Sequence, residues 1–305
     1  MILRTKPSNY ISMESRGCTK ELLRHLYMNE NKTQKEIRTI LNIKDEKVLN
    51  RWFKESGIEK KTNKGRYSFN ENFFDVINTE EKAYWLGFIW CDGYVCKSER
   101  KGYSTYDFKL DLAIQDKKHI EKFKNSLDST HPIRIYKSKS HFDKEKDTEI
   151  ARIYIANKYF AKNLYDKYKL IADRYDTKDV VNSIPESMIR HFIRGILEAD
   201  GGISDYYIKE DRLNTTTRKM TVRFYTYESL LIFIRNHFIE KCLSNFQQQL
   251  RKRHEGKDGY AFELSYTGNK QVPKILRYLY KDATVYLDRK KKICDTILSN
   301  REMLD

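Results

Sequence analysis

Two short stretches decide the fold of this chain: WLGFIWCDG at residues 85–93 and IRGILEADG at residues 193–201. Each is an apolar run with one glycine in its middle and an Asp-Gly pair at its end. Gly87 and Gly195 occupy the same place in the two runs, ahead of Asp92 and Asp200. A glycine in a helix interior costs about 1 kcal/mol relative to alanine, so its recurrence at matched positions requires a physical reason.

The reason that the sequence offers is close helix packing. A further small residue follows each glycine by one helical turn, Cys91 after Gly87 and Ala199 after Gly195. Small residues at this spacing flatten one helix face, which allows another backbone to approach closely. We therefore expect the two helices to pack side by side at the glycines, so that two halves of the chain form a pseudo-dimer.

The two aspartates end these helices in an electrostatically unfavourable place. The carbonyl groups at a helix carboxyl end already make it negative, which disfavours an acid there by up to about 1 kcal/mol. Packing the two helices would also bring Asp92 and Asp200 together. A divalent cation ligated by both carboxylates and by helix-end carbonyl oxygens would explain the arrangement, and oxygen-only ligands suit Mg²⁺, with other divalent cations possible. A metal-bound water beside a phosphodiester is a source of a nucleophile.

The segments around the two motifs repeat in the same order, in halves spanning residues 78–182 and 183–305. Alternating apolar and polar residues predict strands, and longer amphipathic stretches predict helices. Asn78 with Glu81, and Ser183 with Glu186, have the spacing of a capping box and predict the starts of the two motif helices. The predicted fold class is α+β, with two pseudo-symmetric αββαββα halves. The strands are expected near 94–97, 106–114, 132–136, 151–156, 202–209, 219–227, 246–253 and 260–266.

The first 66 residues are predicted to form a small all-α domain, joined to the halves by a connector at residues 67–77. Apolar spacing indicates a helix over 34–41, a turn over 42–45 and a second helix over 46–55. This pattern is typical of a helix-turn-helix that binds DNA, although an ordinary helical hairpin has the same pattern. The second helix would present four polar residues to solvent: Lys47, Asn50, Arg51 and Lys54.

Composition points to a polyanionic partner. The 305 residues include 59 Lys and Arg against 43 Asp and Glu, giving a formal charge of +16 and a pI near 9.4. Such a surface favours nucleic acid over a membrane, while a merely soluble lysine-rich protein is the plain alternative. Five cysteines without a C-x-x-C pair, no signal peptide and no apolar run near about 18 residues predict a cytoplasmic chain with reduced thiols and no membrane span. Cys91 and Cys96 lack the second ligand pair of a zinc site.

The two motifs resemble the LAGLIDADG motif of homing endonucleases, in the single-chain form that carries two motifs. The resemblance covers about residues 78–300, and the N-terminal segment is similar to helix-turn-helix appendages of some members. It implies that the motif helices lie at a pseudo-twofold interface and that the two sheets form a saddle over the DNA major groove. The implied activity is Mg²⁺-dependent cleavage of both strands of a long, asymmetric DNA site by a monomer.

The resemblance also carries over site residues. The acidic metal ligands correspond to Asp92 and Asp200, and the carbonyls before them belong to Cys91 and Ala199. A polar residue where the second strand ends corresponds to Gln115, and the second half offers Thr226 instead. A basic residue before the last helix of each half corresponds to Arg174 in the first half and to Arg289 or Lys290 in the second. We take Lys290 as the second-half candidate.

The two halves differ at the sixth motif position, and their strands carry polar residues that would face the DNA. The sixth motif position, often acidic in the family, is Trp90 in the first copy and Glu198 in the second, which implies different local helix contacts. Strand alternation puts polar side chains on the sheet face that would read base edges and phosphates. These are Asp107, Lys109 and Asp111 in the first half, and Lys219, Thr221, Arg223 and Tyr225 in the second.

The sequence thus predicts a site-specific DNA endonuclease that is free-standing or intron-encoded. An intein is disfavoured because the chain starts with Met and ends in REMLD, without the residues that splicing requires. The alternatives are a DNA-binding regulator or an RNA splicing maturase on the same scaffold, and a structural nucleoid protein. Loss of the metal acids would indicate a non-catalytic binder, and both acids are present.

Overall fold

The computed structural model describes residues 11–60, 66–100, 102–139, 147–171, 177–210, 215–244, 248–256 and 259–302. The chain divides into two compact units, residues 1–68 and 69–305. Each unit has a hydrophobic core of its own. None of the helices in the described ranges combines the length and the apolar character that crossing a membrane requires.

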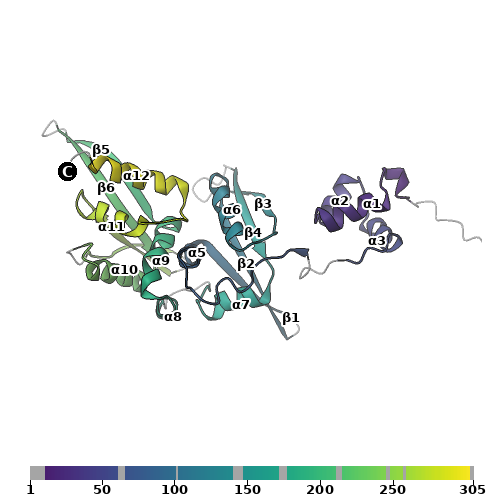
Figure 1. Ribbon diagram of the computed structural model, residues 1–305, viewed down its shortest axis with the longest axis horizontal. Helices are drawn as coiled ribbons and strands as arrows, with labels where there is room; N and C mark the ends of the chain where they lie inside the picture. Colours follow the sequence, from purple (N-terminus) through teal and green to yellow (C-terminus); the bar gives the residue numbers. More distant parts are fainter. Residues whose placement is uncertain are drawn as a thin grey trace, which may run out of the picture. The chain divides into compact units, whose positions relative to one another are not determined.

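The first unit is built from short helices (Figure 1). They are η1 (Glu14–Arg16), α1 (Lys20–Arg24), η2 (His25–Asn29), α2 (Gln34–Ile40) and α3 (Glu46–Glu55). Thr33 and Glu36 form a reciprocal capping box at the start of α2, and the Asp45 side chain caps α3. Val48, Leu49, Trp52 and Phe53 bury one face of α3, and a left-handed Asn42 (φ 50°) lies in the turn before it. The predicted pair of helices is present, one residue shorter in α2.

The second unit contains two halves with the same order of elements. In the first half these are α5 (Glu80–Asp92), β1 (Gly93–Arg100), β2 (Tyr103–Ala113), η3 (Ile114–Asp116), α6 (Lys117–Ser126), β3 (Ile133–Lys139), β4 (Asp147–Ile155) and α7 (Lys158–Asp166). A short helix, α8 (Lys178–Asn182), leads to the second half. There the elements are α9 (Glu186–Ala199), β5 (Gly202–Glu210), β6 (Thr215–Thr226), α10 (Glu228–Glu240), β7 (Arg251–Gly256), β8 (Gly259–Thr267), α11 (Gln271–Tyr280) and α12 (Asp288–Glu302).

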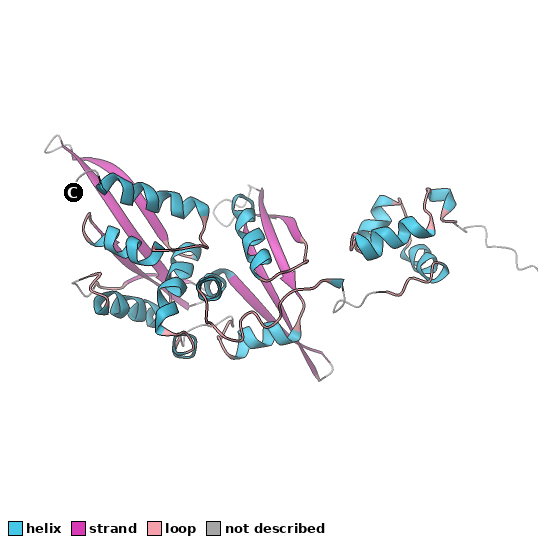
Figure 2. Cartoon of the chain, in the orientation of Figure 1, coloured by secondary structure: helices cyan, strands magenta, loops and turns pink. Residues whose placement is uncertain are grey.

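Each half contributes one antiparallel four-stranded sheet. The strand orders are β1-β2-β4-β3 and β5-β6-β8-β7, so the two sheets have the same topology. Helices lie against one face of each sheet (Figure 2): α6 and α7 contact β2 in the first, and α10 and α11 contact β8 in the second. The predicted α+β class with two αββαββα halves is confirmed.

Strict alternation along β2 explains how the first sheet faces its helices. Tyr106, Phe108, Leu110 and Leu112 are buried, whereas the residues between them are partly exposed. Because successive strand residues point to opposite faces, one face joins the core and the other stays uncovered. Residues of the predicted connector also enter this core, since Phe73, Phe74 and Ile77 are buried in it.

The predicted caps of the two motif helices are wrong in detail. Thr79, not Asn78, caps α5, with its hydroxyl accepting from the Lys82 amide at 3.3 Å. Pro185 occupies the N-cap position of α9 and makes no side-chain cap, while the Ser183 hydroxyl donates to the Val180 carbonyl at the end of α8. The turn between α8 and α9 uses Ser183 locally, so its spacing from Glu186 is not a capping box here.

Candidate active site at the ends of two packed helices

The site begins with the contact between α5 and α9, whose backbones touch at the two motif glycines. A Cβ added to Gly87 would lie 2.1 Å from the Phe192 carbonyl oxygen, and one added to Gly195 would lie 2.2 Å from the Tyr84 carbonyl oxygen. No real side chain tolerates such distances, so only glycine permits this approach. This is the close contact that the two glycines predicted, and α5 and α9 lie side by side in Figure 1.

Both helices end in an aspartate followed by a glycine. Asp92 is the last residue of α5 and is half-buried, and Asp200 is the C-cap of α9 and is exposed. The glycine after each allows a tight exit into the next strand, because a Cβ on Gly93 would lie 2.4 Å from the Ile89 carbonyl oxygen and one on Gly201 would lie 2.6 Å from that of Leu197. The glycine after each aspartate is therefore a geometric requirement at both ends.

Lys290 lies at the carboxyl end of α9. Its side chain comes from the first turn of α12 and the residue is only 4% exposed. The Nζ group donates to the carbonyl oxygens of Glu198 (2.7 Å), Gly201 (2.7 Å) and Leu197 (3.0 Å). Leu197 and Glu198 belong to the last turn of α9, where carbonyl groups point out of the helix end. The Lys290 ammonium group adds hydrogen bonds there, beside the one from the Gly201 amide to Leu197, and offsets the negative end of the helix dipole.

The charges of several neighbours act on Lys290. Burial, and then the neighbouring Arg289, lower the pKa of Lys290 to about 8, while the charges of Glu198, Asp92 and Asp200 act in the opposite direction. Both motif aspartates are thus close enough to Lys290 to act on it electrostatically. One buried lysine from the second half faces an acid from each half.

Glu198, at the sixth motif position, is completely buried and fully hydrogen-bonded. Its Oε2 accepts from the Tyr84 hydroxyl (2.5 Å) and the Leu287 amide (2.6 Å), and its Oε1 accepts from the Tyr280 hydroxyl (2.6 Å). Burial raises the pKa of Glu198, and the hydrogen bonds from Tyr280 and Tyr84 oppose that shift. The resemblance implied different local helix contacts at this position, and the structure shows a hydrogen-bonding centre here.

The first motif is constructed differently at that position. Trp90 is buried, and its indole Nε1 donates to the Tyr168 carbonyl at 3.1 Å. The two halves therefore share the helix pairing and the terminal aspartate, but an apolar side chain in one replaces the buried acid of the other. The difference between WCDG and EADG in the sequence is the signal that marks it.

A second buried charged residue, Arg194, lies one helical turn before Glu198 on α9, and the sequence did not reveal its burial. Arg194 is 0% exposed and forms an ion pair with Glu80 at 2.7 Å. Its guanidinium also donates to the carbonyl oxygens of Leu279 (2.8 Å) and Val285 (3.2 Å). These partners are far from Arg194 in sequence, so no local pattern indicates them.

The sequence offered three further candidates for catalysis: Gln115, Arg174 and Arg289. Gln115 is exposed in η3, immediately after β2, and the carboxylate of its neighbour Asp116 accepts from Arg289 at 3.1 Å. Arg289, the alternative to Lys290, is therefore engaged with the first half. Arg174 lies outside the described residues.

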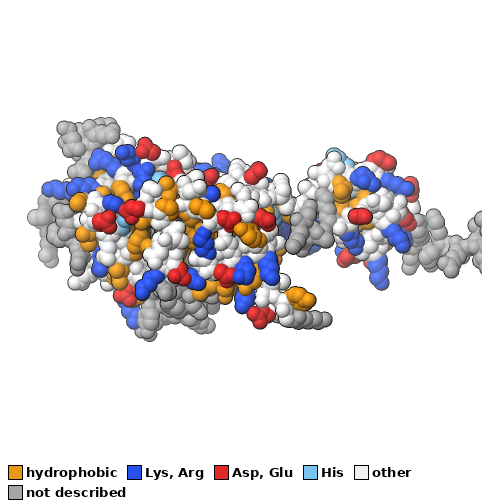
Figure 3. Space-filling model, turned by 60° about the horizontal axis from the view of Figure 1, so that its bottom comes forward, with side chains coloured by type: hydrophobic (Ala, Val, Ile, Leu, Met, Phe, Trp, Pro, Cys, Tyr) orange, Lys and Arg blue, Asp and Glu red, His pale blue; other side chains and the backbone are white. Residues whose placement is uncertain are grey.

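Most of the predicted DNA-facing residues lie on the uncovered sheet faces. Lys109 and Asp111 are half-buried on β2, where Arg152 of β4 pairs with Asp111 at 2.6 and 2.5 Å. On the second sheet, Lys219 is exposed and Arg223 lies 3.8 Å from Glu263. On the face of the second unit drawn in Figure 3, basic side chains are interspersed with acidic and apolar ones.

Tyr225 and Thr221 of β6 have different surroundings on the sheet. Tyr225 is half-buried and the Arg253 guanidinium lies 4.6 Å from its ring centroid, so an aromatic and a basic group share one place on the face. Thr221 lies on the same strand face as Lys219 and Arg223 but is only 3% exposed, so its side chain offers little surface to a partner. It pairs across the sheet with Ser204 and Thr267 in the middle of the sheet, where its neighbours cover it.

The chain is similar to solved structures of LAGLIDADG homing endonucleases. The structure of I-LtrWI bound to target DNA matches with a TM-score of 0.47 and 12% identity, over 74% of this chain and 92% of that chain. Meganuclease I-SmaMI bound to uncleaveable DNA matches with a TM-score of 0.48 and 13% identity, over 73% and 90%. Meganuclease I-AabMI bound to uncleaved DNA matches with a TM-score of 0.45 and 15% identity, over 72% and 90%. No protein-family model and no curated protein matches the chain.

In the first unit, α3 presents only part of its predicted surface. Lys47 and Lys54 are exposed, whereas Asn50 and Arg51 are half-buried. The Arg51 guanidinium donates to the Ile11 carbonyl oxygen at 2.5 Å and lies 3.7 Å from Glu55. Arg51 thus serves the fold of this unit, and Lys47 and Lys54 are the exposed basic residues of α3, beside the exposed acids Glu46 and Glu55.

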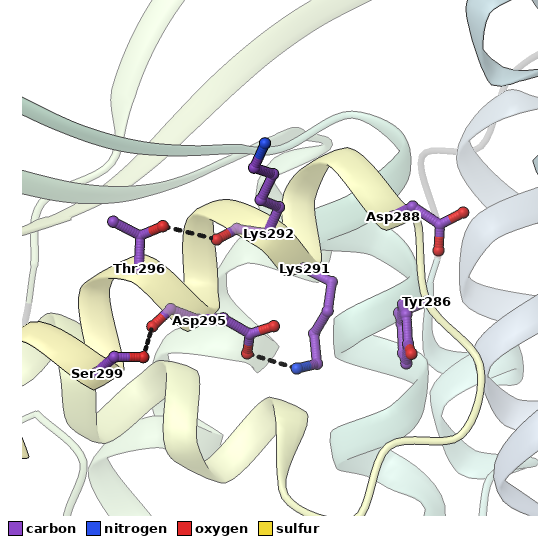
Figure 4. A pocket seen from close by; sticks show the side chains of 7 residues that line it. All are labelled: Tyr286, Asp288, Lys291, Lys292, Asp295, Thr296 and Ser299. Carbon is purple, nitrogen blue, oxygen red and sulfur yellow. Dashed lines mark hydrogen bonds and ion pairs between the residues drawn. The ribbon is translucent and has the colours of Figure 1, made fainter.

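A surface hollow of about 540 Å³ on the second unit is separate from the paired helices (Figure 4). It is lined by Tyr286 and by residues of one helix, α12: Asp288, Lys291, Lys292, Asp295, Thr296 and Ser299. Lys291 is directed to Asp295, and the Ser299 hydroxyl donates to the Asp295 carbonyl oxygen. The hollow contains neither motif aspartate; Lys291 pairs with Asp295 along the helix, and Asp288 pairs with Lys122 of α6.

Proposed function

We propose that the chain is a LAGLIDADG homing endonuclease, which makes a metal-dependent double-strand break at a long, asymmetric DNA site. The observation that carries this proposal is the pairing of α5 and α9 at glycines, with an aspartate at the same end of each. A divalent cation shared by the paired helix ends would explain why each half carries an acid at a helix end where an acid is unfavourable.

The donor set at the helix ends fits a magnesium ion. Across the described residues, no group of three or more His, Cys, Asp and Glu side chains could hold a metal. The proposed ligands are instead two carboxylates, of Asp92 and Asp200, and two main-chain carbonyls, of Cys91 and Ala199. Lys290 Nζ lies 3.5 Å from the Ala199 oxygen, too long for a strong hydrogen bond, which leaves that carbonyl available. Oxygen donors in small number, completed by water and phosphate, are the usual magnesium environment.

The residues around these ligands would control charge. A bound Mg²⁺ supplies a Lewis acid and a water of lowered pKa. Lys290 holds the end of α9 in place and carries a positive charge beside both acids, where it would offset negative charge that builds up on the scissile phosphate. Gln115 and Arg174 remain our candidates for groups that orient water or neutralise phosphate.

Duplex DNA is the proposed partner, bound by one copy of the chain. The uncovered faces of the two sheets carry Lys109, Lys219, Arg223 and Tyr225, which would contact phosphates and base edges in the major groove. In the first unit, Lys47 and Lys54 are exposed basic residues of α3, in keeping with a helix that enters a groove. The net charge of +16 favours this partner.

Replacing the acids tests the proposal. The wild-type chain is incubated with DNA from its own genomic neighbourhood, including an allele that lacks the gene, with and without Mg²⁺. Asp92→Asn and Asp200→Asn are each expected to abolish double-strand cleavage and to leave DNA binding intact, because they remove a ligand charge without changing side-chain size. Asp128→Asn, at an exposed left-handed turn that asparagine tolerates, is the control. Full cleavage by either motif variant would reject the metal ligands, and binding without any cleavage by the wild type would indicate a regulator instead.

A further inference from the structure

The buried acid Glu198 connects the motif helix to the start of α12. Its Oε2 accepts the amide hydrogen of Leu287, the residue immediately before α12, at 2.6 Å. The Leu287 carbonyl oxygen in turn accepts from the amides of Lys290 and Lys291, both at 3.0 Å. Glu198 is therefore two hydrogen bonds away from the backbone of Lys290.

The side chain of Lys290 completes this hydrogen-bond network by returning to α9. Lys290 Nζ returns to α9 and donates to the main-chain oxygen of Glu198 at 2.7 Å. The Glu198 side chain thus holds the beginning of α12, and α12 delivers a charge back to the Glu198 backbone. Glu198, Leu287 and Lys290 are all buried and hydrogen-bonded, so this network of hydrogen bonds has one favourable arrangement. Loss of one of these groups would leave the hydrogen-bonding atoms of the others unsatisfied.

Two tyrosines fix the acid from other elements. Tyr84 comes from α5 in the first half and Tyr280 ends α11 in the second, and each donates its hydroxyl to Glu198. The Tyr84 hydroxyl also lies 2.8 Å from Nε2 of buried His119. With Tyr84 donating to Glu198, the histidine must be the donor to Tyr84, so α6 also helps to orient the acid.

Trp90 makes the first half different. It occupies the place of Glu198 in the other motif, and its indole donates to the Tyr168 carbonyl oxygen. An indole accepts no hydrogen bond, so Trp90 holds no backbone amide as Glu198 does. The described residues therefore contain this acid-to-helix connection only at the second motif.

We infer that Glu198 is a positioning residue that holds Lys290 at the end of α9, so that its loss acts most strongly on the site at that helix end. The inference rests on the proposed endonuclease function. The sixth motif position would then have a positioning role in the second motif, where it is Glu198, and no such role in the first, where it is Trp90. Loss of Glu198 then slows the cutting of one DNA strand much more than the cutting of the other.

The test compares strand-specific cleavage by four full-length variants on a duplex labelled on either strand. Glu198→Ala removes the acid, Lys290→Met removes the charge, and the double variant combines them. Glu198→Gln keeps the shape: its amide oxygen can accept from Leu287 and Tyr84, and the Tyr280 hydroxyl can turn to accept from the amide nitrogen. Phe238→Leu is the control, because Phe238 is buried in the same half against Phe224 and Tyr266, away from the Glu198 contacts.

Glu198→Ala is expected to lose cleavage of one strand on the order of a hundredfold, the cost of a misplaced catalytic group, so that nicked DNA accumulates. Glu198→Gln is expected to retain cutting of both strands. The double variant is expected to cut the sensitive strand as slowly as Lys290→Met, since the acid acts through the lysine. An equal loss on both strands, or a double variant much slower than Lys290→Met, would overturn the inference.

Hydrogen exchange separates this inference from the proposed function. The amides of Leu287, Lys290 and Lys291 should exchange faster in Glu198→Ala than in the wild type, and should be unchanged in Phe238→Leu at those positions. Unchanged exchange rejects the positioning role even if the wild-type chain cuts no DNA tested. If Glu198→Ala does not fold, Tyr280→Phe, which removes one hydrogen bond and keeps the acid, is expected to give a smaller loss on the same strand; equal effects on both strands would again contradict the inference.

Discussion

Arg194 brings a positive charge into the interior of the second unit beside the paired helices. Its ion pair with Glu80 joins α9 to the first turn of α5, and Glu80 also accepts from the Thr284 amide at 2.8 Å. The guanidinium carbon lies 5.2 Å from the Tyr84 ring centroid. A buried charge of this kind is unfavourable by itself and is tolerated only with its partners in place. Arg194 therefore makes the junction of the two halves specific.

Arg194→Leu is expected to lower the free energy of unfolding by about 3–5 kcal/mol, because it leaves Glu80 without its buried partner. The double variant Glu80→Gln/Arg194→Leu is expected to lose less than the sum of the single variants, since no unpaired charge remains. Urea unfolding of the three variants measures this coupling. Additive losses would mean that the ion pair contributes nothing beyond packing.

At the scale of the helix pair, two effects compete at each glycine. Alanine is better than glycine in a helix interior by about 1 kcal/mol. A Cβ at Gly195, however, would lie 2.2 Å from the Tyr84 carbonyl oxygen and 2.7 Å from the Phe88 amide nitrogen, and backbone cannot rotate away as a side chain can. The helices would have to separate, and that loss of packing outweighs the propensity gain.

We therefore expect Gly195→Ala to destabilise the second unit by about 1–3 kcal/mol, the usual cost of overpacking a core. Gly202→Ala is the matched control, because a Cβ there meets nothing within 4 Å. Its effect should stay within about 0.5 kcal/mol. Thermal unfolding followed by circular dichroism compares the two, and equal melting temperatures would contradict the close-contact explanation.

The elements themselves could be predicted from the sequence, whereas the partners of single polar residues could not. β2 and α3 were predictable because period 2 and period 3.6 are local properties, and the glycine spacing indicated the helix contact. Helix α8 was missed because five residues are too few to show a period. Thr79 rather than Asn78 caps α5 because adjacent polar residues give nearly the same signal, and tertiary packing chooses between them. The hydrogen bond from Lys290 to Glu198 joins residues 92 positions apart, and no sequence pattern spans that distance.

At the scale of the whole molecule, the chain consists of two units and carries a formal net charge of +16. The first unit has its own core around Leu49 and Trp52, and α3 exposes Lys47 and Lys54 on the side away from that core. If these lysines bind phosphates, each releases counterions on binding and steepens the salt dependence of affinity. The charge of the first unit then contributes to DNA binding in proportion to the number of phosphates that it neutralises.

Lys47→Ala/Lys54→Ala is expected to weaken duplex binding and to reduce the slope of log affinity against log salt by about 2, because each lysine that neutralises a phosphate adds roughly one to that slope. Lys20→Ala/Lys35→Ala is the matched control, because it removes the same charge from exposed positions of α1 and α2. Titration of labelled duplex DNA at several salt concentrations measures both slopes. Equal reductions in the two double variants would mean that only net charge matters and that α3 does not face the DNA. A reduction confined to Lys47 and Lys54 would identify α3 as the helix that binds the phosphate backbone.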